Sequence, residues 1–233
     1  MLIACIALLV GSGAQSQSSD NTTLIVNRST DYVEIFLGMP AVEIENVFGY
    51  VPDGIVQSDG TVDFEPLRLG TWQITDELFE SVKASIGGQA VTFEGMSMMV
   101  HPKVTTLPFV TPLDGMIAIS VCTVETPDTA LRLEDLHIYM GLIAYTDAPM
   151  GPLDLHFEGS KNGSVEVMVR DYNGGWLSNV HMAVLDDGSL PSLSPGGLHR
   201  TDIPFMLLAI PIALISIVLA VRLTARTTQV STG

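Results

Sequence analysis

The sequence is poor in basic residues. Only 10 of its 233 residues are Lys or Arg, against 26 Asp or Glu, and the formal net charge is −16. An acidic surface of this kind repels the phosphates of nucleic acids and the headgroups of anionic lipids. We therefore expect no nucleic-acid partner.

Cysteine is also scarce, occurring only as Cys5 and Cys122. Cys5 lies in a segment that we expect to be removed, which would leave Cys122 without an intramolecular disulfide partner. A eukaryotic cell-surface domain of this size commonly carries several bridges, so the bacterial periplasm is favoured. Three Asn-X-Ser/Thr sequons, at Asn21, Asn27 and Asn162, keep a eukaryotic origin open. We interpret Cys122 as a small buried hydrophobic residue.

Motifs typical of catalysis or of cofactor binding are absent. The sequence contains no G-x-S-x-G nucleophile elbow, no H-E-x-x-H zinc motif, no C-x-x-C pair and no glycine-rich phosphate loop. Acidic residues are too numerous and too scattered to indicate a catalytic pair. The chain is therefore more readily interpreted as a binding protein than as an enzyme.

The amino terminus resembles a signal peptide. Residues 1–10 form an apolar run, and Ser12 and Ala14 fit the positions before a signal-peptidase cut. We expect a signal peptide over 1–14 and a mature start at Gln15. One departure from the usual pattern is that no Lys or Arg precedes the apolar run.

A second apolar run, over residues 203–221, has 19 residues and no charge. As a helix it would be about 28 Å long, which matches the hydrocarbon thickness of a bilayer. Arg222 and Arg226 follow it, and Asp202 precedes it. Positive flanks stay in the cytoplasm, so we expect a single-pass protein of the inner (plasma) membrane. Its acidic domain would lie outside and its tail, 222–233, in the cytoplasm.

Between the two apolar ends, short apolar runs alternate with turn signals. This pattern predicts a mainly β fold, an antiparallel β-sandwich-like domain with one short helix, besides the single C-terminal transmembrane helix. We expect a lead-in and first strand over 15–30, an acidic β-rich domain over 31–188 and a linker over 189–202. The predicted strands cover residues 23–26, 32–37, 61–69, 90–100, 116–124, 131–145, 153–157, 164–170 and 177–185.

The predicted helix covers residues 75–86. Thr75 can cap its start, and Gly87 and Gly88 would end it. Four apolar residues share one face at helical spacing. They are Leu78, Phe79, Val82 and Ile86.

Two further patterns concern the strands. Asn173, Gly174 and Gly175 predict a hairpin turn before the last strand. Residues 33–41 (VEIFLGMPA) resemble residues 136–144 (LHIYMGLIA). These segments are either equivalent strands of two related halves or a chance similarity between β-runs.

Methionine and histidine gather in three segments, and soft sulfur with imidazole suits copper. The candidate metal ligands are Met96, Met98, His101, His137 and Met140. In a regular strand Met96 and Met98 would point the same way and Met99 the opposite way. The alternative interpretation is that these methionines fill the core.

Three functional hypotheses follow. The first is a membrane-anchored binding or assembly module with a membrane or periplasmic protein partner, which requires no cofactor. The second is a periplasmic copper-binding protein. The third, an anchored hydrolase, has the least support because no catalytic motif is present.

Overall fold

The computed structural model describes residues 21–51, 56–63, 73–105, 107–120, 130–160 and 164–196. The predicted signal peptide, transmembrane span and cytoplasmic tail lie outside these residues. All the described helices and strands belong to one compact unit, which ends at Pro195. Among the described residues, no helix is both long and apolar enough to cross a membrane.

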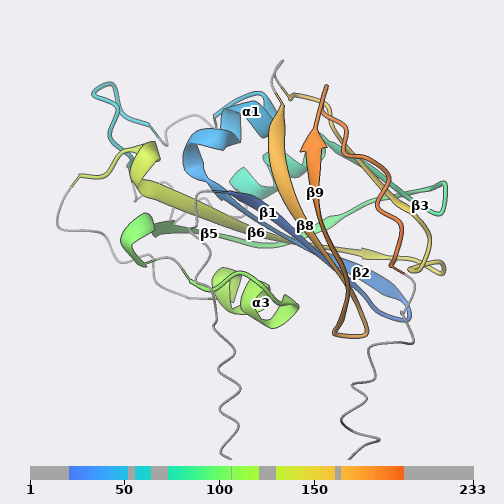
Figure 1. The fold of residues 1–233 in the computed structure, drawn as a ribbon. Coiled ribbons are helices and arrows are strands. Elements are labelled where there is room, and N and C mark those ends of the chain that lie inside the picture. Colours follow the sequence, from blue (N-terminus) through green and yellow to red (C-terminus); the bar gives the residue numbers. More distant parts are fainter. Residues whose placement is uncertain are drawn as a thin grey trace, which may run out of the picture. The chain divides into compact units, whose positions relative to one another are not determined.

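Six strands form the main sheet, in the order β5-β6-β2-β1-β8-β9 (Figure 1). Their neighbours are antiparallel except for β1 and β8, which are parallel. The strands are β1 (Thr22–Arg28), β2 (Tyr32–Pro40), β5 (Glu94–Pro102), β6 (Leu136–Tyr145), β8 (Val165–Asn173) and β9 (Trp176–Leu185). Because β1 lies inside the sheet, the first described strand of the chain is buried between neighbours.

A second, antiparallel sheet has the order β4-β3-β7. It consists of β3 (Val82–Ile86), β4 (Gln89–Val91) and β7 (Leu153–Phe157). Ile86, Leu155 and Phe157 belong to the same apolar core as Leu24 and Val26 of the main sheet. The prediction of a mainly β fold is therefore confirmed, and the strands form two sheets that are largely antiparallel.

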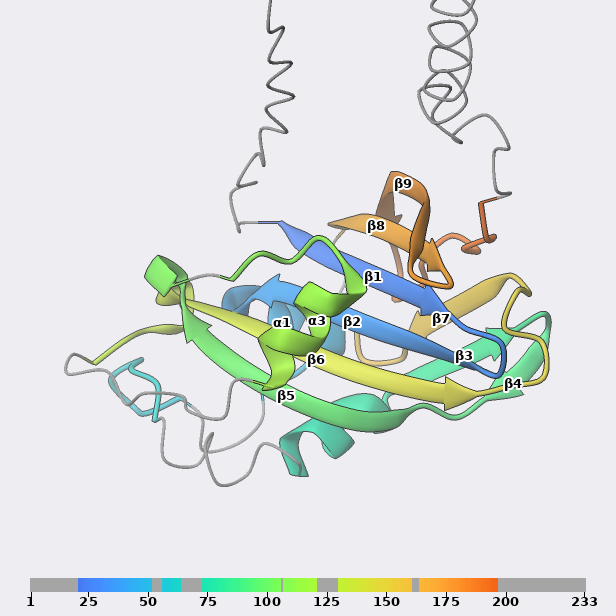
Figure 2. The same ribbon diagram turned by 90° about the horizontal axis from the view of Figure 1, so that it is seen from below.

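Helices cover both faces of the main sheet. The first face packs on the shared core with η1 (Ala41–Glu43) and α1 (Ile44–Phe48). The second face carries α3 (Pro112–Ser120), which lies over β2 and β6 (Figure 2). Two short 3-10 helices, η2 (Lys103–Thr105) and η3 (Leu133–Asp135), flank β5 and β6. The described residues thus contain more helices than the single one predicted.

The predicted helix over 75–86 is only partly correct. Residues 73–80 are helical, and Leu78 and Phe79 are buried as expected. Val82 and Ile86, however, lie on β3, and Gly87 and Gly88 form the turn to β4 with positive φ angles. Glycine pairs of this conformation favour hairpins as readily as helix ends. Val82 and Ile86 have helical spacing relative to Leu78 by coincidence, although they belong to a strand.

The predicted strand over 116–124 is wrong where the structure describes it, because residues 112–120 form α3. The helix begins with a reciprocal cap. The backbone N–H of Asp114 donates to Thr111 Oγ1 at 3.2 Å, and the N–H of Thr111 donates to Asp114 Oδ2 at 2.8 Å. Pro112 occupies the first helical position. The backbone N–H that proline lacks would have no partner within the helix there. Cys122 lies outside the described residues.

Other sequence predictions agree closely with the structure. β7 has the predicted bounds, and Asn173, Gly174 and Gly175 make the turn between β8 and β9. The two similar segments lie on β2 and β6, which pair with each other. Residues 189–195, assigned to the linker, instead pack on the domain. Leu190 and Leu193 are buried, and their backbone N–H groups donate to the carbonyls of Leu155 and Leu153.

Candidate functional site

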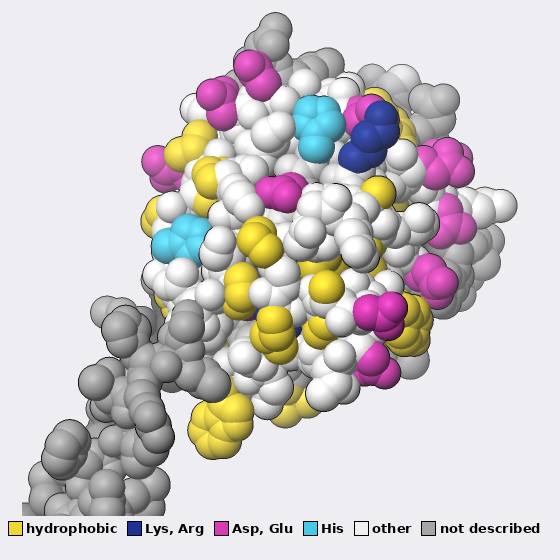
Figure 3. Space-filling model, turned by 90° about the vertical axis from the view of Figure 1, so that its right-hand side faces the viewer, with side chains coloured by type: hydrophobic (Ala, Val, Ile, Leu, Met, Phe, Trp, Pro, Cys, Tyr) yellow, Lys and Arg dark blue, Asp and Glu magenta, His cyan; other side chains and the backbone are white. Residues whose placement is uncertain are grey.

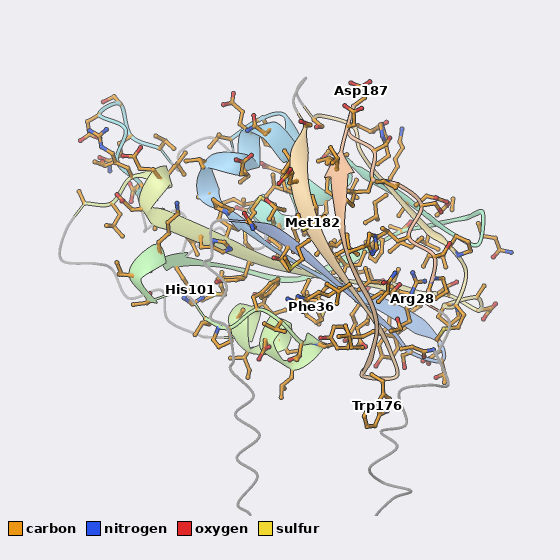
Figure 4. The ribbon with its side chains drawn as sticks, in the orientation of Figure 1. Arg28, Phe36, His101, Trp176, Met182 and Asp187 are labelled. Atoms are coloured by element: carbon orange, nitrogen blue, oxygen red, sulfur yellow. The ribbon has the colours of Figure 1, made fainter. Side chains whose placement is uncertain are left out.

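The five predicted metal ligands lie on β5 and β6 but on opposite faces of the sheet. Met98 and Met140 are directly opposite each other and belong to the shared core. His101 lies on the face covered by α3 (Figure 4). His137 is directly opposite His101 and shares that face. The five side chains therefore do not surround one point, and binding of copper stays a prediction.

A β-bulge changes the direction of Met96. The strand register shifts between Gly95 and Ser97, so one extra residue is inserted there. Met96 consequently packs against the cluster under α3, whereas Met98 faces the shared core. The expectation that Met96 and Met98 point the same way is wrong, because it assumed a regular strand.

The α3 side of β5 and β6 carries a buried group of polar rings. Tyr139 lies between two histidines, with ring centroids 5.4 Å from His101 and 4.8 Å from His137. Phe109 covers Tyr139 at 5.0 Å. Met99, which is also buried, is the residue opposite Tyr139. Together these side chains place sulfur and imidazole on one face.

Burial shifts the pKa values of two members of this group, His101 and Tyr139. Burial lowers the pKa of His101, while a contact with Ala118 O, 3.3 Å from Nε2, acts in the opposite direction. The neutral ring donates to this carbonyl near the end of α3, where carbonyls lack partners within the helix. Burial also raises the pKa of Tyr139 to about 12, although a hydrogen bond with the Leu107 backbone partly offsets this.

A buried ion pair joins β1 to β8. Arg28 is 0% exposed, and its Nε donates to Asp171 Oδ1 at 3.0 Å. The other guanidinium nitrogens donate to the carbonyls of Pro149, Gly151 and Leu193 at 2.7 to 2.9 Å. Burial raises the pKa of the Asp171 carboxyl and Arg28 opposes this rise. Because Arg28 is saturated by protein groups, we assign it a structural role.

The strand β9 has an unusual surface for the edge of a sheet. Alternate residues Val180, Met182 and Val184 are exposed on its outer face, with Met182 at 50%. The ten residues Trp176–Leu185 include no Asp, Glu, Lys or Arg. Figure 3 views the side where β9 lies and shows exposed apolar side chains in a group, with acidic side chains around them.

The other sheet edges are protected, as far as the structure describes them. Along β7, the segment 189–193 adds bridges to Leu153 and His156. β4 has only three residues, and β5 carries a bulge and begins at Glu94. These are common ways to prevent unwanted strand pairing. β9 also carries a bulge, at Ser178, but from Asn179 to Leu185 it pairs regularly with β8, and no other described strand lies beyond it. This part of β9 is the candidate binding surface.

Sequence reasoning predicted β9 as a strand but did not recognise it as a binding surface. The available signal was the absence of charge over Trp176–Leu185 in a strongly acidic chain. Exposure could not be read from the sequence, since a charge-free strand is more often buried. Comparison with known proteins adds no identity, because no family model and no curated protein matches this chain.

Proposed function

We propose that this chain is a membrane-anchored assembly module whose domain lies outside the cytoplasm and binds a protein partner through β9. The anchor would be residues 203–221, with the C-terminus in the cytoplasm. The observation that supports this function most directly is the long, charge-free edge strand with an apolar outer face. Free N–H and C=O groups on such an edge can pair with an added strand.

The chemistry of β9 specifies the partner. Val180, Met182 and Val184 would contact alternate apolar side chains of an extended segment. The protein carries a net charge of −16, so a segment with acidic flanks would be repelled. The partner is therefore an extended, alternating apolar segment with neutral or basic flanks, from a membrane or periplasmic protein.

A peptide titration tests this interface on the full chain in detergent. The probe is a synthetic peptide of alternating Val and Thr flanked by Lys, and the control peptide has Glu flanks. We expect the Lys-flanked peptide to bind, to protect β9 amides from hydrogen exchange and to lose at least tenfold in affinity with Met182→Lys. The matched control Val104→Lys, at the exposed Val104 of η2, should bind normally. Equal binding to both variants would refute the interface.

The anchor requires a separate measurement. The full chain should sediment with membranes and be released only by detergent, and a protease added outside should digest the domain but spare the tail. A chain that stays in the supernatant would refute the anchoring. Binding of the peptide at β9 does not depend on this result.

A periplasmic copper protein is the second candidate function, favoured by Met99, His101 and His137, which lie on one face of β5 and β6. Met96 packs on the same face but lies beside Gly141, about 13 Å along β6 from His137, and is not a candidate ligand with them. Competition titrations with Cu(I) should show weaker binding for Met99→Leu and His137→Ala. Met98→Leu and Met140→Leu, on the opposite face, are the matched controls and should bind like the wild type. Absence of stoichiometric Cu(I) binding to the wild type would refute this function.

A further inference from the structure

Several loops meet at one end of the domain, around Arg28. Its guanidinium binds the carbonyls of Pro149 and Gly151 in the loop before β7. Its own carbonyl accepts the N–H of Gly174, in the β8–β9 turn, at 2.9 Å. Arg28 thereby fixes the β6–β7 loop and the β8–β9 turn next to each other.

Large amphipathic and apolar side chains are exposed at this end. Trp176 and Leu177, directly after the β8–β9 turn, are 76% and 51% exposed. Met150 of the β6–β7 loop and Tyr145, the last residue of β6, are also exposed. Figure 4 shows Trp176 projecting from the turn, away from the body of the domain. We call Tyr145, Met150, Trp176 and Leu177 the apolar tip.

The chain leaves the domain at the same end. Arg28 donates to the carbonyl of Leu193 at 2.9 Å, and the described residues finish three positions later, at Gly196. Only six residues separate Gly196 from Ile203, where the predicted span begins. Even fully extended, this stretch covers about 25 Å. The end that carries the apolar tip is therefore held close to the membrane if the span is inserted.

The chemistry of the tip suits the region of lipid headgroups. Trp and Tyr prefer this region because one part of the ring system is apolar and the other can form hydrogen bonds. The loops beside the tip carry Asp31 and Asp147 and no exposed cation among their described residues. Zwitterionic headgroups are therefore favoured over anionic ones.

We infer that the apolar tip inserts into the zwitterionic headgroup layer of the membrane in which this chain is anchored. This inference rests on the proposed anchoring but not on the proposed partner of β9. Insertion fixes the orientation of the domain, because the tip and the chain exit give two separate attachments to one surface. A single flexible attachment would leave the domain free to rotate.

Fluorescence quenching by brominated lipids tests the inference. The full chain is reconstituted in phosphatidylcholine vesicles with bromines at a shallow or a deep position of the acyl chain. We compare the wild type with Trp176→Phe, so that the difference between them reports Trp176 alone. We expect Trp176 emission to shift to the blue and to be quenched more strongly by shallow than by deep bromines.

A control places tryptophan at the opposite end of the sheet. Val104 follows β5 at the end where Pro102 lies opposite Leu136, far along β6 from Tyr145. Trp176→Phe combined with Val104→Trp should show no more quenching than Trp176→Phe alone. Flotation of the same vesicles reports the anchor separately. Protein that floats without quenching at Trp176, or with equal quenching at position 104, overturns the inference, whereas protein that does not float refutes the anchoring itself.

Discussion

Phe36 of β2 lies directly opposite Gly141 of β6. Two positions along the pair, Tyr139 of β6 lies opposite Gly38 of β2, so each aromatic ring faces a residue without a side chain. This reciprocal arrangement arises from the two similar segments, each of which has an aromatic residue two positions before a glycine. It leaves room for α3 to approach the sheet closely.

The contact between Gly115 of α3 and Phe36 predicts a strict size limit. A Cβ atom at Gly115 would lie 2.5 Å from Cγ of Phe36. Gly115→Ala should therefore destabilise the domain by about 1–3 kcal/mol, despite the better helix propensity of Ala. Urea denaturation of the full chain in detergent measures this change. Ile117→Ala, on the exposed side of the same helix, is the control.

A second substitution separates the clash from a general weakening of α3. Phe36→Ala removes Cγ and Cδ2, the two ring atoms nearest the new methyl group. The double variant Gly115→Ala/Phe36→Ala should lose less stability than the sum of the single changes, by at least about 0.5 kcal/mol. Strict additivity would contradict the contact.

Breaking the buried ion pair of Arg28 and Asp171 should lower the free energy of unfolding much more than breaking an exposed pair. Asp171→Ala leaves the guanidinium buried without its counter-ion, at an expected cost of about 3–5 kcal/mol. Lys83→Met breaks the exposed pair between Lys83 and Glu158 and should cost at most about 1 kcal/mol. Denaturant midpoints of the two variants test this contrast. Similar losses would show that Arg28 does not depend on Asp171.

Stability should fall in mildly acidic solution because of His101. Its folded pKa is lower than the ordinary value of 6.5, so the unfolded chain binds the proton first as the pH falls. The contribution of His101 to folding stability is therefore fully present above about pH 6.5 and is lost from there down to its folded pKa. Denaturation at several pH values should show this slope in the wild type, and it should be smaller in His101→Gln. An equal slope in both proteins would exclude His101 as the cause.

The start of α3 supplies a further test. Thr111→Ala removes the side-chain oxygen that accepts the N–H of Asp114 and should cost about 1 kcal/mol. Thr111→Ser keeps the oxygen and should remain close to the wild type. If both variants lost the same stability, the cap would not be what stabilises this helix.

The sequence predicted the strands more reliably than the helices. β7, β8 and β9 were recognisable because their apolar residues alternate between clear turn signals. Residues 116–120 were misassigned because Ile117 and Ile119 alternate with the small residues Ala118 and Ser120, which suits the period of a strand. The start signal Thr111-Pro112-x-Asp114 was present in the sequence and should have taken precedence.

The candidate surfaces were less predictable. The bulge near Met96 depends on how β5 pairs with β6, a relationship between residues about 40 positions apart that no local pattern records. The exposure of Met182 depends on β9 being the last strand of its sheet. Strand order follows from the whole set of pairings, so a strand's own residues do not reveal its neighbours.

The parallel pairing of β1 with β8 has a consequence for the order of events during synthesis. Residues 22–28 emerge early from the ribosome, yet their partner, residues 165–173, follows about 140 positions later. Until then the N–H and C=O groups on the outer edge of β1, in the β1–β2 hairpin, have no strand partner. Another strand can pair with them. Such long-range closure makes folding slow, because the outer edge of β1 stays unpaired until most of the domain has been made.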